Sequence, residues 1–276
     1  MQQKKNVKTK AFPDVLLKLW EKNDGVDFAI ALARLTGWML QVDWLTSDED
    51  EDVQNMIPIR VYVETNRNIV FDFIGKKSVI AFNKYVIQPI AFGRLRNGLK
   101  NITTRCYTEE ALRELPLKVR SSDYGIEKAT LAILAHPTFL ASIPKRQNPE
   151  ISAQVASQFS HGNCVPFAEV MQEMTALPAM GIEVSKYSDV SGSRLGFCHA
   201  VIVHTDGNVE DSWGIQPLSV ILERFYIEDY TMSEQIFLDA KDRQKRESPD
   251  RYNEAYKKAL NLLKTLNSES SYNLDL

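Results

Sequence analysis

The sequence predicts an α+β protein built from two related copies of one unit, and three pairs of segments indicate this. "FPDVLLKLWEKNDGVDFAIALARLTG" near residue 13 and "NPEISAQVASQFSHGNCVPFAEVMQEMTA" near residue 148 both run proline, acid, amphipathic helix, glycine and second helix. "IRVYVETNRNIVFDFIG" (59–75) and "HAVIVHTDGNVEDSWG" (199–214) both read as strand, turn and strand. "IQPIAFGRLRN" (87–97) matches "IQPLSVILERF" (215–225). Chance similarity between two small α+β segments is the alternative.

The two copies divide the chain into residues 1–145 and 146–276. The segment 137–150, "PTFLASIPKRQNPE", contains three prolines and a polar end, which is typical of a linker. The chain of 276 residues is long enough for each half to bury a core of its own.

Composition narrows the class of protein. The net charge of −3 gives no reason to expect nucleic acid as the main partner. The basic start, "MQQKKNVKTK", lacks the apolar core of a signal peptide, and no stretch approaches a membrane span. The three cysteines include no CxxC pair, so neither a disulfide framework nor a common zinc site is predicted, and no cofactor is expected. We expect a cytoplasmic protein, or one delivered into a target cell without a cleaved signal.

Cys164 lies at the start of a predicted helix over 164–177. The buried face of that helix is marked by apolar residues at helical spacing: Phe167, Ala168, Met171 and Met174. Asn163 is predicted to cap the helix, and Pro166 suits its first turn. The free N–H groups and dipole at such a terminus lower a thiol pKa and favour the reactive thiolate. The alternative is an inert buried cysteine, since free cysteine is among the most buried residue types.

The hairpin after this helix decides whether a histidine and a carboxylate can meet. Alternation puts His199 and Val201 on one face of their strand. A three-residue loop, Thr205-Asp206-Gly207, would pair Val201 with Asp211 and make His199 the diagonal neighbour of that carboxylate. A two-residue turn would put His199 on the opposite face. Glycine is favoured at the last, left-handed position of a three-residue loop, so we predict the longer loop.

These residues have the types that thiol catalysis requires. Cys164 would be the nucleophile, His199 would carry its proton, and Asp211 would orient the imidazole. Trp213, on the same face as Asp211, would shield the His–Asp bond from water.

At these positions the chain resembles the papain-like cysteine hydrolase superfamily, whose papain branch reads Q-x3-G-x-C, then H-A-V, then N-S-W-G. The matching segments here are Gln158 to Cys164, His199-Ala200-Val201, and Asp211-Ser212-Trp213-Gly214. The resemblance covers roughly 155–225 and implies that the Gln158 side chain supplies the oxyanion hole, together with the backbone N–H of Cys164.

Two departures favour a compact branch of that superfamily. The orienting residue is Asp instead of Asn, and only 35 residues separate Cys164 from His199. Both features are similar to glutamine deamidases and to papain-fold domains of bacterial toxins and effectors. That resemblance implies attack on an amide of a protein substrate, in a target-cell protein if the chain is an effector. It leaves deamidation, peptide cleavage and transfer to an amine open.

The first copy lacks the reactive groups. It has Val26 where Cys164 stands and Ile59 or Arg60 where His199 stands, and it keeps only Asp72. We therefore expect a non-catalytic first copy.

Other readings of the second copy remain. His161 and Asn163 could border the substrate, although a surface histidine explains His161 equally simply. A metal site is disfavoured because His161, Cys164, Cys198, His199 and His204 lack zinc-motif spacing. The competing function is an inactive binding or scaffold protein in which Cys164 is merely buried.

Overall fold

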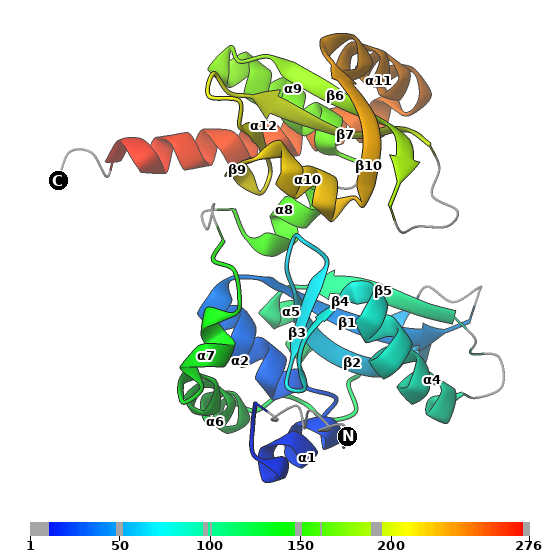
Figure 1. Cartoon of the computed structure of the whole chain (residues 1–276), viewed down its shortest axis with the longest axis vertical. Helices are drawn as coiled ribbons and strands as arrows, with labels where there is room; N and C mark the ends of the chain where they lie inside the picture. The colour runs from blue at the N-terminus through cyan, green and yellow to red at the C-terminus, as the bar shows by residue number, and fades with distance from the viewer. Residues whose placement is uncertain are drawn as a thin grey trace, which may run out of the picture. The chain divides into compact units, whose positions relative to one another are not determined.

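The chain forms two compact units, Met1–Arg146 and Gln147–Leu276 (Figure 1). The computed structural model describes residues 11–47, 52–95, 99, 101–146, 151–160, 162–188 and 195–272. Each unit has one antiparallel five-stranded sheet with helices packed against it, so the protein is α+β. The division between the units follows Arg146, one residue beyond the predicted boundary.

The first unit begins with two helices, continues through four strands that pair in succession, and adds its fifth strand beside the first. Its sheet order is β4-β3-β2-β1-β5. Helix α2 packs against β2, and α6 covers α2. The elements of this unit are α1 (Asp14–Lys22), α2 (Val26–Thr36), β1 (Met39–Thr46), η1 (Val53–Asn55), β2 (Ile57–Glu64), β3 (Ile69–Asp72), β4 (Gly75–Ser78), α3 (Val79–Phe82), the π-helical η2 (Asn83–Ile87), α4 (Gln88–Arg94), β5 (Asn101–Tyr107), α5 (Glu109–Arg113), α6 (Asp123–Leu134) and α7 (Pro137–Ala141).

The second unit has the same order of connections, and its sheet order is β10-β6-β7-β8-β9. Helix α9 packs against β7 and α11 against β6, while α12 packs on α9. The close approach of α11 depends on Gly181, where an added Cβ would lie 2.6 Å from the backbone nitrogen of Phe237. The elements are α8 (Ala153–Ser160), α9 (Cys164–Thr175), β6 (Ala179–Tyr187), β7 (Gly196–Val203), β8 (Val209–Asp211), β9 (Gly214–Gln216), α10 (Leu218–Arg224), β10 (Ile227–Ser233), α11 (Glu234–Glu247) and α12 (Pro249–Tyr272).

The equivalent strands of the two sheets also share their register. Val42 pairs with Val61 in the first unit, and Gly181 pairs with Ala200 in the second. Both partners are 139 positions further along the chain in the second unit, and the same separation relates Gly75 to Gly214, which both have positive φ. No insertion therefore separates the units over this part of the two folds.

The hairpins that follow β2 and β7 have the same loop length. In the second unit the His204 N–H donates to the Asn208 carbonyl, so the loop is Thr205-Asp206-Gly207, and Gly207 has a φ of +84°. Ile202 then pairs with Glu210, which is the register that places Val201 opposite Asp211. The predicted three-residue loop is confirmed. The first unit closes the same loop with Asn68, at a φ of +54°, in the place of Gly207.

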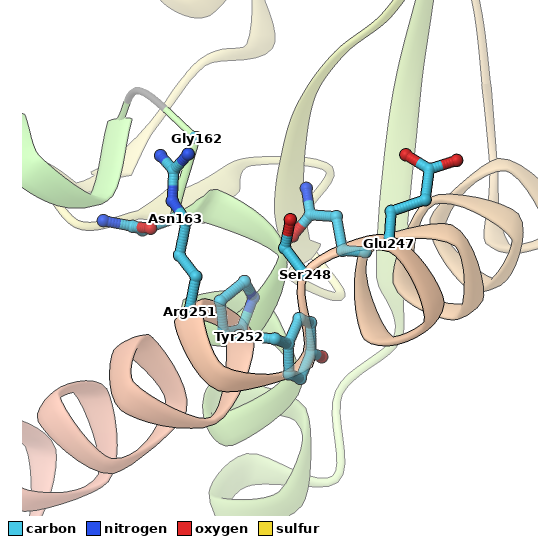
Figure 2. A pocket seen from close by; sticks show the side chains of 8 residues that line it. Gly162, Asn163, Glu247, Ser248, Arg251 and Tyr252 are labelled. Atoms are coloured by element: carbon cyan, nitrogen blue, oxygen red, sulfur yellow. The ribbon is translucent and has the colours of Figure 1, made fainter.

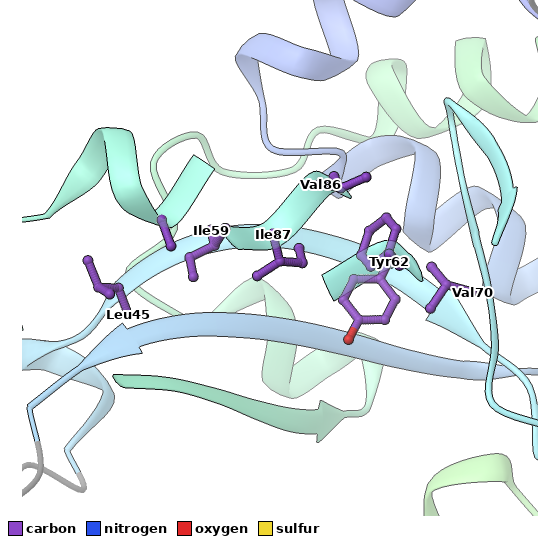
Figure 3. Close-up of a cluster of buried hydrophobic side chains, with 8 residues drawn as sticks. Leu45, Ile59, Tyr62, Val70, Val86 and Ile87 are labelled. Atoms are coloured by element: carbon purple, nitrogen blue, oxygen red, sulfur yellow. The ribbon is translucent and has the colours of Figure 1, made fainter. Parts of the chain in front are cut away.

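Each sheet is stabilised by apolar side chains from the helix that follows the hairpins. In the first unit these side chains come from β1 and β2 and from the segment 79–91, and Tyr62 packs against Phe82 (Figure 3). In the second unit α10 contributes Ile221 to a cluster with Ile182, Val201 and Val209. Burial of such side chains stabilises by roughly 1.5–3 kcal/mol each. The side of β7 that carries Val201 therefore faces α10, whereas Ala200 faces α9.

Two expectations about segments are wrong. Pro137–Ala141 is helical, and the Trp38 indole donates to the Pro144 carbonyl at 2.7 Å, so this part of the predicted linker packs on the first unit. The two "IQP" segments are not equivalent, because Ile87 and Gln88 are helical whereas Ile215 and Gln216 belong to β9. Among the described helices, none is both long and apolar enough to cross a membrane.

Candidate functional site

His199 and Asp211 are brought together by the β7–β8 hairpin. His199 Nε2 lies 2.9 Å from Asp211 Oδ2, and both side chains are buried. An ionised carboxylate can only accept, so Nε2 carries the ring proton and donates it to Asp211. In the neutral ring Nδ1 is then the basic nitrogen. The contact predicted from the loop length is therefore present.

Asp211 is the centre of a larger buried network. Its Oδ1 accepts from the Trp213 backbone N–H at 2.9 Å and from Gln216 Nε2 at 3.1 Å. Its Oδ2 also accepts from Arg224 Nη1 at 2.6 Å. Burial alone would raise the Asp211 pKa, but the Arg224 charge and the hydrogen bond with His199 together hold that pKa well below its usual range. Asp211 is thus ionised at neutral pH.

Cys164 begins α9 and points toward the sheet. Its thiol accepts hydrogen bonds from the backbone N–H groups of Ala200, Cys164 itself and Val165. These donors lower the thiol pKa, as the helix start predicts, but burial is the larger effect. Cys164 is 3% exposed, and burial raises its pKa to about 12. The expectation of a lowered pKa is therefore wrong, because the helix terminus is covered instead of facing water.

The remaining predicted site residues lie around this network without joining it uniformly. Trp213 is buried, and its indole donates to Ser160 Oγ at 2.5 Å. Gln158 is on the exposed side of α8. Asn163 occupies the N-cap position of α9, but its side chain makes no cap bond and donates to the Gln158 carbonyl at 3.2 Å, so the predicted capping bond is wrong. His161 lies outside the described residues.

A cavity of about 200 Å³ opens beside the start of α9, on a side that Cys164 does not line (Figure 2). Its walls come from the residues before and after Cys164 and from the junction of α11 and α12: Gly162, Asn163, Pro166, Gln244, Glu247, Ser248, Arg251 and Tyr252. The cavity therefore adjoins the helix that carries the thiol but gives no direct access to Cys164, His199 or Asp211.

Arg224 is the residue of this site that sequence reasoning missed. It ends α10 and is 6% exposed. The signal for it was weak: one basic residue in the otherwise apolar stretch "LSVILERF". An arginine at a helix end usually reaches water or the last carbonyls, so only the packing of α10 against the sheet identifies Asp211 as its partner.

The first unit has different groups at the equivalent positions. At the same separation of 139 residues, Gly25 corresponds to Cys164, Arg60 to His199 and Asp72 to Asp211. The counterpart of Cys164 is thus Gly25 and not the adjacent Val26. An added Cβ at Gly25 would lie 2.7 Å from the Val61 carbonyl oxygen, and its φ is +84°. No thiol and no imidazole occupy these positions in the first unit.

The described residues contain no group of three or more His, Cys, Asp or Glu side chains arranged to hold a metal ion. Comparisons with protein-family models, with curated proteins and with solved structures found no match for this chain.

Proposed function

We propose that the second unit is a papain-like thiol hydrolase that attacks an amide of a protein substrate through Cys164, His199 and Asp211. One observation carries the proposal: a buried imidazole is fixed on a carboxylate at 2.9 Å, while a thiol at a helix start contacts the next residue of the same strand. A nucleophile, a base and a group that orients the base are the elements that covalent catalysis requires.

The reaction would run in two steps. Cys164 Sγ attacks the amide carbonyl carbon while its proton passes to Nδ1 of His199, and the leaving nitrogen takes that proton as the C–N bond breaks. The product is a thioester and either ammonia, from a glutamine side chain, or an amine, from a peptide bond. Water then attacks the thioester, gives a proton to His199 and releases the acid, after which the thiol is restored.

The oxyanion of each step would be stabilised by the Cys164 backbone N–H and, by the papain resemblance, by the Gln158 side chain. Gln158 is exposed on α8 and Cys164 is covered, so substrate entry requires side chains over the thiol to move. Asn163, which links the two segments through the Gln158 carbonyl, is the nearest such residue in the chain.

We also propose that the two units arose by duplication and that the first is a non-catalytic copy. The shared strand order and the constant separation of 139 residues support the duplication. Gly25 and Arg60 supply neither a nucleophile nor a base with a usable pKa, which supports the loss of catalysis. A role in holding the protein substrate or a partner is left to this unit.

A second candidate function is a binding protein in which both units are inactive. The burial of Cys164 and its pKa of about 12 favour this candidate, since a reactive cysteine is normally accessible and acidic. The two candidates make opposite predictions about the thiol in the native protein.

The deciding experiment is alkylation by iodoacetamide in a Cys106→Ser/Cys198→Ser background, with the modified residue identified by mass spectrometry. A hydrolase should label at Cys164 without denaturant, and His199→Gln should slow labelling while the control His204→Gln should not. Labelling that requires urea and ignores His199 would establish the binding protein. A hydrolase should also deamidate or cleave denatured casein, and Cys164→Ser should remove that activity.

A further inference from the structure

Arg224 and His199 meet the same oxygen of Asp211. Arg224 Nη1 lies 2.6 Å and His199 Nε2 lies 2.9 Å from Asp211 Oδ2. The imidazole is 0% exposed and the arginine 6% exposed. One carboxylate charge is therefore shared by a permanent cation and by a ring that could become a second one.

The charge balance of this buried group decides the state of the ring. A guanidinium stays protonated at any pH that a protein experiences, so Arg224 already neutralises Asp211. A proton added to His199 would leave one uncompensated positive charge away from water, and burying an unpaired charge is costly. The arrangement thus favours the neutral imidazole even though a carboxylate touches it.

We propose that Arg224 is a positioning residue that holds the resting site as a neutral thiol beside a neutral imidazole. The proton of Cys164 would then move to His199 only during attack on the amide, and no thiolate–imidazolium pair would form beforehand. This inference rests on the proposed function for its catalytic meaning, but the protonation state of His199 can be measured without any substrate.

The surroundings of the ring contain no second anion in the described part of the chain that would offset Arg224. Facing His199 are Asp211 from β8, Arg224 from α10 and the aromatic ring of Phe225, whose centroid is 4.9 Å from that of the imidazole. The nearby thiols are Cys164 on α9 and Cys198 on β7, and burial raises the pKa of both. Neither thiol supplies a negative charge at neutral pH.

The test is a pH titration of the histidine rings by NMR in the full chain labelled with ¹³C-histidine. In the wild type His199 should stay neutral at pH 7, and its Nε2–H should persist. Arg224→Gln should raise its titration midpoint by about 1–2 pH units, because Asp211 then acts on the imidazole alone. Arg224→Lys should restore the neutral ring, and Arg243→Gln, which removes an arginine of α11, should change nothing. His204, which pairs with Glu210, is the internal reference.

The wild-type spectrum alone can overturn the inference, so it does not depend on whether Arg224→Gln folds. A charged His199 at pH 7 would overturn it, as would an unchanged midpoint in a folded Arg224→Gln. Failure of the proposed function has a different signature. Cys164 would then resist iodoacetamide in the native wild type, while the effect of Arg224 on the His199 midpoint would remain.

Discussion

The two units place different chemistry on one framework of strands. At equivalent positions the first has Gly25, Arg60 and Asp72, and the second has Cys164, His199 and Asp211. In both, Oδ1 of the aspartate accepts a backbone N–H two residues on, at 2.8 Å from Ile74 and 2.9 Å from Trp213. The aspartate therefore has a structural task in each hairpin, independent of catalysis.

The units differ in where the balancing cation comes from. In the first, Arg60 of β2 stands in the position of the histidine and also pairs with Glu21 at 3.0 Å. In the second, Arg224 of α10 supplies the guanidinium and leaves the strand position to an imidazole. Burial raises the Asp72 pKa to about 6 despite Arg60, whereas Arg224 and His199 lower that of Asp211. A buried aspartate thus needs direct hydrogen bonds from its cation, and not only a nearby charge, to stay fully ionised.

The comparison is broken most strongly by replacing each aspartate with asparagine. Asp211→Asn should lower the free energy of unfolding of the second unit by about 3–5 kcal/mol, because Arg224 is left buried without its anion. Asp72→Asn should cost the first unit only about 1–2 kcal/mol, since Arg60 keeps Glu21. Urea unfolding followed by hydrogen exchange and mass spectrometry measures each unit separately. Equal losses would show that Arg224 is not specially dependent on Asp211, and exposed Asp123→Asn is the control.

The two units should also respond oppositely to pH. Asp43 and Asp72 have folded-state pKa values raised to about 6 by burial, so the folded first unit binds protons more tightly than its unfolded chain. Its stability should be highest near pH 4 and fall by about 2–3 kcal/mol per group as pH rises through 6. Asp211 has a lowered pKa, so its contribution is present above pH 4 and is lost only as pH falls further.

The measurement is the same urea and hydrogen-exchange experiment at pH 4, 5, 6 and 7. A first unit that gains stability with rising pH would contradict the burial of its carboxyl groups. Asp43→Asn should flatten part of its pH dependence, because that carboxyl, which accepts from Tyr62 at 3.2 Å, no longer titrates.

The start of the second helix in each unit offers a sharper comparison. Gly25→Ala should destabilise by about 1–3 kcal/mol, because the left-handed backbone and the Val61 carbonyl leave no room for a Cβ. Cys164→Ala already has its Cβ accommodated and should cost about 1 kcal/mol for the lost sulfur contacts. Thermal unfolding compares the two variants. A tolerated Gly25→Ala would mean that the first unit could regain a side chain at this position.

The smallest effect is expected at the hairpin loops. Gly207→Ala should cost about 1 kcal/mol, because a φ of +84° is unfavourable for alanine although nothing crowds the site. Asn68→Gly should change stability by less than about 0.5 kcal/mol, because asparagine tolerates this conformation. The His199–Asp211 contact can be monitored in Gly207→Ala through the Nε2–H signal, and its loss would show that the loop controls the register.

The sequence by itself determined the α+β class, the helix that begins at Cys164 and the register of the hairpin. Alternation along Cys198–Val203 and the glycine at 207 are local signals, and local geometry then fixes which side chains face each other across two strands. The meeting of His199 and Asp211 was predictable for that reason.

Only the tertiary structure decided how this pair is surrounded. The burial of Cys164 depends on segments that pack over the start of α9, and a helix terminus in the sequence does not reveal whether water reaches it. Arg224 comes from a helix whose approach to the sheet is set by apolar packing around Ile221, so no spacing rule links it to Asp211. The position of Gly25 opposite Cys164 likewise emerged only from paired strands. Desolvation and partner choice are properties of the packed chain, and they set the protonation states on which the chemistry depends.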